Sequence, residues 1–257
     1  MSLWIPFGGL VLAEIGYPLA SGETRAALVV VTVALGYALS VAHAFSTRGV
    51  RAGAALVGVT TGGGFAIEAV GRATGLPFGV YDYTDLLGPR LLGVPVAIPL
   101  AWTWMAWPAW SAAGRLTSST AARVAVAGVG LAAWDLFLDP QMVAEGYWRW
   151  ADPDPALPGV PDVPIGNYAG WLAVSVLLMA LLALLGGAPL RSAGASDDPM
   201  LALYLWTYGS SVLAHAVFLG MPASAGWGAI GMGLVAAPLA WRLRPRPRPR
   251  SHPGPAG

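Results

Sequence analysis

Residues 169–190, AGWLAVSVLLMALLALLGGAPL, carry no ionisable side chain. A helix of about 20 such residues crosses the roughly 30 Å of hydrocarbon in a bilayer. Stretches of similar apolar character occur along the rest of the chain, at Leu3 to Ala20, Ala26 to Ser46, Gly53 to Gly71, Leu92 to Ala113, Thr120 to Asp139, Pro199 to Leu219 and Ala223 to Trp241. We therefore predict an all-α, polytopic transmembrane helix bundle of seven to eight spans. The range allows for the first stretch, which Pro6, Glu14 and Pro18 interrupt.

The composition of the whole chain agrees with this prediction. Apolar residue types make up 56% of the 257 residues, and charged types only 11%, whereas an ordinary soluble domain has about 25% charged residues. The absence of cysteine excludes disulfides, thiolate metal sites and cysteine nucleophiles. A formal net charge of +1 provides no field for nucleic acid. We expect membrane lipid, and no nucleic acid, as a partner.

The arginines predict how the chain is oriented. Residues 1–241 form a single transmembrane domain in this interpretation, and residues 242–257 form a disordered Arg/Pro-rich tail, because proline at every second position forbids a helix. With eight spans, the side that bears both termini carries ten arginines, five of them in the tail, and the opposite side carries four. The positive-inside rule then places both termini in the cytoplasm of a multi-pass protein of the cell membrane.

Two connections between spans are long and rich in aromatic and turn residues. They are residues 72–91, RATGLPFGVYDYTDLLGPRL, and residues 140–168, PQMVAEGYWRWADPDPALPGVPDVPIGNY. Long loops without regular structure are usually functional or disordered, and the aromatic content argues against disorder. Because both loops leave the same, non-cytoplasmic side of the predicted bundle, they can build one site together.

Ionisable residues within spans are the main candidates for function, because burying charge in hydrocarbon is costly. Six qualify: Glu14, His43, Glu68, Asp135, Asp139 and His215. All except His43 fall toward the non-cytoplasmic ends of their spans. The sequence thus predicts a cluster of carboxyls and one imidazole at one depth of the bundle.

Asp135 and Asp139 are four residues apart, so one helical face presents both carboxyls. Two neighbouring carboxyls rarely both ionise in a low dielectric, so one keeps its proton and is suited to act as a general acid. The alternative is structural: Asp139 ends the helix before Pro140, and Asp135 forms a hydrogen bond with a neighbouring span.

Glu68 is a second candidate acid, because it follows Gly62 to Gly64, where a ligand or another backbone can approach closely. Its alternative role is an ion pair with Arg72, one turn later. In the loop that follows, Tyr81 and Tyr83 flank Asp82. This segment either turns back into the bundle or anchors the protein at the membrane surface.

Two further features concern histidine and cofactors. His215 is either a catalytic or substrate-binding group or a hydrogen-bonded structural one. No H-E-x-x-H spacing is present, and no Gly-rich motif fits a nucleotide phosphate. We therefore expect neither a metal nor another cofactor.

Several short motifs in combination resemble one membrane family. They are Glu68 with the following G-L-P-F-G-V-Y-D-Y at 75–83, G-V-P-V-A-I-P-L-A-W at 93–102, W-D-L-F-L-D-P at 134–140, G-Y-W-R-W at 146–150 and I-G-N-Y at 165–168. Between Gly64 and Trp171 the chain resembles the bacterial and archaeal carotenoid biosynthesis membrane proteins, a family that includes carotenoid end-group hydratases.

The resemblance implies a hydratase (hydro-lyase) that adds water to the terminal double bond of an acyclic carotenoid without a cofactor. In that chemistry an acid protonates the alkene, a tertiary cation forms, and water captures it. The residues of this chain that fit such chemistry are Asp135 or Glu68 as proton donor, Tyr81, Tyr83 and Trp134 as aromatic faces toward the cation, and Asp82, Asp139 or Asn167 as groups that position and deprotonate water. The expected partners are a lipophilic carotenoid and other carotenoid enzymes.

Two other functions fit the same residues. A carotenoid end-group cyclase or isomerase uses the same acid but excludes water, so its product is isomeric with the substrate. A transporter or a non-catalytic membrane scaffold needs no acid at all, although a transporter is expected to show related halves and broken helices at the midplane.

Overall fold

The computed structural model describes residues 3–187 and 197–244. Each stretch predicted to span the membrane contains a helix, although the stretch from Leu92 to Ala113 becomes helical only at Ala97. The helices are α1 (Trp4–Gly16) with a 3-10 turn η1 (Tyr17–Leu19), α2 (Gly22–Leu56), η2 (Val57–Gly62), α3 (Gly63–Thr74), α4 (Ala97–Leu116), α5 (Thr120–Ala132), α6 (Asp135–Ala144), α7 (Ile165–Leu185), α8 (Asp198–Leu213), η6 (Ala214–Phe218) and α9 (Pro222–Leu243).

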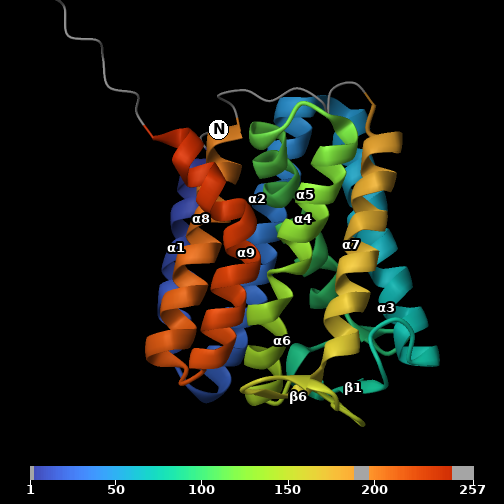
Figure 1. The fold of residues 1–257 in the computed structure, drawn as a ribbon, viewed down its shortest axis with the longest axis vertical. Helices are drawn as coiled ribbons and strands as arrows, with labels where there is room; N and C mark the ends of the chain where they lie inside the picture. Colours follow the sequence, from blue (N-terminus) through green and yellow to red (C-terminus); the bar gives the residue numbers. More distant parts are fainter. Residues whose placement is uncertain (1–2, 188–196, 245–257) are drawn as a thin grey trace, which may run out of the picture.

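Five helical stretches of the described chain are long and apolar enough to cross a membrane, which agrees with an all-α membrane protein. They are Gly22–Thr74, Thr120–Ala144, Ile165–Leu185, Asp198–Phe218 and Pro222–Leu243. The first contains two of the predicted spans, because Gly49 has a non-helical backbone with φ 81°. A positive φ is readily adopted only by glycine, and the chain turns back there toward α3 at the other end of the bundle (Figure 1). The count of seven to eight spans stays a prediction.

α4 is the central helix of the bundle. It packs against α2, α3, α5, α8 and α9, and residues 101–113 are all buried. A helix that is apolar all round belongs in a protein interior. The tryptophans of this helix therefore pack inside the bundle and do not face lipid.

The two long connections form short strands at one end of the bundle, which the all-α prediction did not include. The first contains β1 (Tyr81–Tyr83), a 3-10 turn η3 (Asp85–Leu87) and β2 (Arg90–Leu91), and β3 (Val94–Pro95) follows it at the start of the stretch predicted as the next span. The second contains β4 (Trp148–Trp150), β5 (Ala156–Leu157) and β6 (Val160–Pro164). β1 pairs antiparallel with β4, so the two connections do meet, as the sequence predicts.

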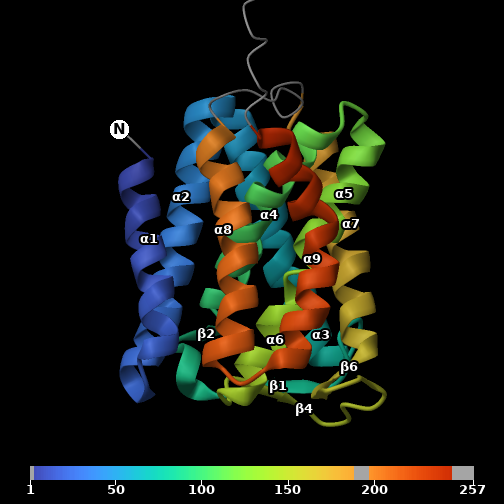
Figure 2. The same cartoon turned by 60° about the vertical axis from the view of Figure 1, so that its left-hand side comes forward.

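Both described chain ends lie at the end of the bundle opposite the strands (Figures 1 and 2). α9 continues through Leu243, so Arg242 and Leu243 belong to a helix and not to the predicted tail. Residues 245–257 of that tail lie outside the described residues.

Candidate active site

Glu68, on α3, accepts hydrogen bonds from three side chains. The phenol of Tyr81 donates to Oε2 over 2.5 Å, and the phenol of Tyr83 donates to the same atom over 2.8 Å. The indole Nε1 of Trp102 donates to Oε1 over 3.0 Å. Only 4% of Glu68 is exposed. Donors on both oxygens favour the ionised form of a carboxyl, so this arrangement suits a buried carboxylate.

Strand geometry explains how the two phenols reach Glu68. Successive side chains of a strand point to opposite sides, and in β1 Tyr81 and Tyr83 are buried while Asp82 is exposed. Burial, and then the Glu68 carboxyl, raises the pKa of both phenols above the ordinary range. Both phenols therefore keep their protons at neutral pH and remain hydrogen-bond donors.

Asp135 and Asp139 share one amide. Nδ2 of Asn167, from α7, donates to Oδ2 of Asp135 over 2.9 Å and also to Oδ2 of Asp139. Nε1 of Trp148, in β4, donates to Oδ1 of Asp139 over 3.1 Å. The predicted common face of the two aspartates is thus confirmed, and α6 continues past Asp139 to Ala144 instead of ending there.

The hydrogen bonds indicate how protons are distributed in this pair. Asp135 is fully buried, and within the described part of the chain its Oδ1 has no hydrogen-bond partner. Two carboxyls that accept from one amide in dry protein repel each other strongly if both are ionised, so such a pair holds one proton between them. The pair is therefore suited to share a proton, whereas the three donors around Glu68 suit an ionised carboxyl.

All of these groups except Asp135 line a small cavity, here called the acid cavity, of about 390 Å³, part of it continuous with the outside. Trp102 and Trp171 stack in its wall with ring centroids 3.9 Å apart and ring planes 9° apart. Its lining is mainly aromatic and otherwise acidic, amide or aliphatic: Glu68, Phe78, Tyr81, Tyr83, Ile98, Ala101, Trp102, Leu138, Asp139, Trp148, Trp150, Asn167 and Trp171.

A second cavity, here called the large cavity, encloses about 940 Å³, part of it continuous with the outside. Most of its wall is apolar, from α2, α4 and α6. It shares four lining residues with the acid cavity: Ile98, Ala101, Leu138 and Trp148. The two cavities therefore adjoin, and the acids lie at the inner end of a space that an apolar ligand can fill.

Comparison with known proteins identifies the family. The family model for carotenoid biosynthesis proteins matches residues 27–236. The chain belongs to this family. It is 38% identical over 136 residues to the bisanhydrobacterioruberin hydratase of Haloarcula japonica, an alignment that covers 50% of this chain and 44% of the relative. The chain thus spans less than half the length of this curated relative. No solved structure matches it.

In this carotenoid biosynthesis protein, six of the residues expected from the sequence come together. They are Glu68, Tyr81, Tyr83, Asp135, Asp139 and Asn167. Asp82 does not join them, and its predicted place in the site is corrected. The strand alternation turns Asp82 outward, where its carboxylate pairs with the Arg72 guanidinium over 3.1 Å. Arg72 therefore pairs with Asp82, and the predicted alternative of a Glu68–Arg72 ion pair is wrong.

Trp134 and His215 lie outside the acid cavity. Trp134 lines the large cavity, where its ring meets Trp104 edge to face with centroids 5.4 Å apart. His215 is buried, with Nε2 3.1 Å from Oε1 of Gln141 and Nδ1 3.0 Å from Oγ of Ser224. Both ring nitrogens therefore have a hydrogen-bond partner, and His215 lines neither cavity.

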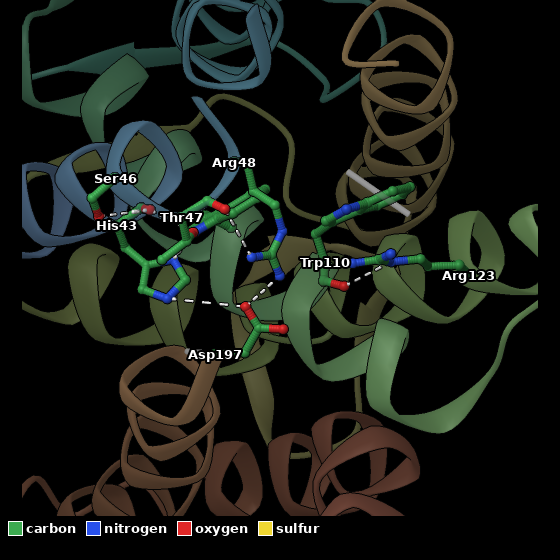
Figure 3. A network of polar contacts seen from close by, with 8 residues as sticks. His43, Ser46, Thr47, Arg48, Trp110, Arg123 and Asp197 are labelled. Atoms are coloured by element: carbon green, nitrogen blue, oxygen red, sulfur yellow. Dashed lines mark hydrogen bonds and ion pairs between the residues drawn. The ribbon is translucent and has the colours of Figure 1, made fainter. Parts of the chain in front are cut away.

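His43 lies at the end of the bundle opposite the strands, as the sequence predicts. Figure 3 shows it beside Asp197, whose carboxylate accepts from the Arg48 guanidinium over 2.5 Å. The Trp107 indole donates to Nδ1 of His43 over 2.9 Å. Arg123 stacks on Trp110 in the same region. This buried polar network is separate from both cavities.

Sequence reasoning missed several aromatic residues of the site. Trp102 donates to Glu68, although it was not among the predicted site residues. Trp171 follows Asn167 by four residues and so shares its helix face, which is a signal that could have revealed it. Among residues 3–187 and 197–244, no three His, Asp or Glu side chains are arranged to hold a metal ion.

Proposed function

We propose that this protein is a carotenoid hydratase that adds water to the terminal double bond of an acyclic carotenoid. The observation that carries the proposal is the pair of adjoining cavities, in which buried carboxyls line the smaller one and mainly apolar side chains line the larger one. The hydratase name of the Haloarcula japonica relative supports the same chemistry. The mechanism below uses only side chains of this chain and needs no cofactor.

The proton comes from the Asp135–Asp139 pair. Asp139 lines the acid cavity, whereas Asp135 lies behind it. The pair gives its proton to the less substituted carbon of the alkene, and a tertiary cation forms at the other carbon. Water then forms a C–O bond to that carbon and returns one proton to the pair, so the net change is the addition of one water molecule. A neutral carboxyl in an apolar site suits such a donor.

Glu68 and the aromatic walls stabilise the cation. A carboxylate already oriented by Tyr81, Tyr83 and Trp102 does not have to reorganise when positive charge develops nearby. The faces of the stacked Trp102 and Trp171 add attraction through the negative charge density of their rings. Glu68 thus acts as the counter-ion in this mechanism, and the aspartate pair acts as the acid.

Asn167 orients the attacking water. Its amide nitrogen is engaged by both aspartates, whereas its Oδ1 has no hydrogen-bond partner within the described chain. Oδ1 of Asp135 also has no hydrogen-bond partner within the described chain. Both oxygens are acceptors, so they suit a water molecule that donates hydrogen bonds while its lone pair faces the cation.

Expression in a host that accumulates an acyclic carotenoid tests the proposal. We expect a more polar pigment whose mass is greater by one or two water molecules. Asp139→Asn and Glu68→Gln should each abolish turnover, while Tyr37→Phe, a change outside both cavities, should leave it intact. A product isomeric with the substrate would identify a cyclase or isomerase instead. An unchanged pigment, with the protein verified in the membrane, would refute the hydratase.

The orientation in the membrane is a separate proposal. We infer that both termini face the cytoplasm, which the arginine distribution supports. Because the chain has no cysteine, single cysteines can be introduced at Ser118 and Asp152, in loops at opposite ends of the bundle. An impermeant thiol reagent applied to intact cells should label position 152 and not position 118. Labelling of position 118 alone would show that both termini face away from the cytoplasm.

A further inference from the structure

The wall of the large cavity is polar where α1 and α8 meet. Glu14 comes from α1, and Thr207, Ser210 and Ser211 come from α8. Positions 207, 210 and 211 share one face of a helix because of its 3.6-residue repeat. Nε1 of Trp206 donates to Oε2 of Glu14, which fixes the carboxyl at this wall.

The polar groups range from partly exposed to buried positions. Glu14 is partly exposed, whereas Thr207 is 3% exposed, and the Thr207 hydroxyl has no hydrogen-bond partner in the described chain. Gln141 lines the same cavity from α6, two residues beyond Asp139, and is held there by His215. These groups form what we call the polar wall: Glu14, Gln141, Thr207, Ser210 and Ser211.

A hydration reaction in an apolar cavity needs a route for water. A buried water molecule requires two to four polar partners. The polar wall supplies carboxyl, amide and hydroxyl groups to a space whose other lining residues, apart from Thr32, are aliphatic or aromatic. An apolar polyene can contact the remaining walls while water occupies the polar wall, so water can enter the large cavity without displacing the substrate.

We propose that the polar wall binds and delivers the water that captures the cation. This inference rests on the proposed hydratase function. The cation has two fates: water forms a C–O bond to it and releases a proton to the aspartate pair, or a neighbouring C–H bond breaks and the same pair takes that proton, which yields an alkene. The polar wall determines the ratio of these two outcomes and does not affect protonation.

The test measures that ratio in D₂O with purified protein and an acyclic polyene. Deuterium enters carbon whenever the cation forms, so total deuterium incorporation reports protonation, and the alcohol-to-alkene ratio of deuterated products reports capture. The variants are Thr207→Val, which keeps the side-chain shape, and Glu14→Leu. The matched control is Tyr208→Phe, which removes a hydroxyl from the same helix outside the cavity lining.

We expect Thr207→Val and Glu14→Leu to lower the alcohol-to-alkene ratio about tenfold each, the effect of losing one ~1.4 kcal/mol hydrogen bond to water. Total deuterium incorporation should stay within about twofold of the wild type, and Tyr208→Phe should match the wild type in both readouts. An unchanged alcohol-to-alkene ratio in the two variants overturns the role of the polar wall but does not contradict the proposed hydratase function. A parallel loss of both readouts also overturns it, because the wall would then act on protonation or folding. Wild-type protein that incorporates no deuterium refutes the acid-catalysed function itself.

Discussion

The Asn167→Leu substitution probes the feature on which the proposed acid depends. Leucine branches at Cγ as asparagine does and has a larger side chain, but it cannot donate hydrogen bonds, so Asp135 and Asp139 lose the amide that they share. A hydrogen bond to a carboxylate contributes about 1.5–3 kcal/mol and one to a neutral carboxyl about 0.5–1.5 kcal/mol, so the loss of one of each gives about 2–4.5 kcal/mol. For a chain of this size, 1 kcal/mol shifts the unfolding midpoint by roughly 2–4 °C. The expected fall in the midpoint is therefore roughly 4–18 °C.

The measurement is thermal unfolding of purified protein in detergent, together with the yield of hydrated carotenoid in a producing host. Ser175→Ala is the matched control, because Ser175 is buried on the same helix and its hydroxyl has no hydrogen-bond partner in the described chain. That control should shift the midpoint by less than about 4 °C. If Asn167→Leu unfolds together with Ser175→Ala, and if it retains wild-type hydration, then the two carboxyls do not depend on a shared donor and the assignment of the acid is wrong.

Three other substitutions test separate parts of the structure. Tyr83→Phe removes one of the three hydrogen-bond donors to Glu68. The yield of hydrated carotenoid should fall about tenfold, while the amount of protein in the membrane stays unchanged. Full activity would contradict the role of the Tyr83 phenol in holding the Glu68 carboxylate. Asp82→Asn should change the free energy of unfolding by less than about 0.5 kcal/mol and leave the product yield unchanged, because the ion pair of Asp82 with Arg72 is exposed. A large loss of product would show that Asp82 takes part in the reaction. Gly36→Ala places a Cβ 2.4 Å from Cδ1 of Trp104, so we expect about 1–3 kcal/mol of destabilisation from overpacking, read as a lower unfolding midpoint. Gly8→Ala, where nothing lies within 4 Å, is its control, and equal midpoints for the two variants would contradict the packing.

Parts of this protein follow from the sequence because they depend on local composition. Runs of apolar residues long enough for a bilayer predict helices wherever they occur, since a backbone in hydrocarbon must satisfy its own hydrogen bonds. The four-residue spacing of Asp135 and Asp139 places both on one face of any helix, and the structure confirms this. The meeting of the two long loops also follows, because both leave the same side of the predicted bundle.

The tertiary structure decided which of the candidate groups face one another. The alternation of β1 sends Tyr81 and Tyr83 to Glu68 and turns Asp82 away, yet three residues are too few for a strand to be recognised from the sequence. Trp102 becomes a donor to Glu68 only because α3 packs against α4, and His215 is separated from the acids by the packing of α6, α9 and η6. Hydrophobic patterning gives a helix its apolar character but does not give its rotation or its neighbours. Rotation and neighbours determine that Asp135 and Asp139 share one amide, and that Glu68 accepts from three donors.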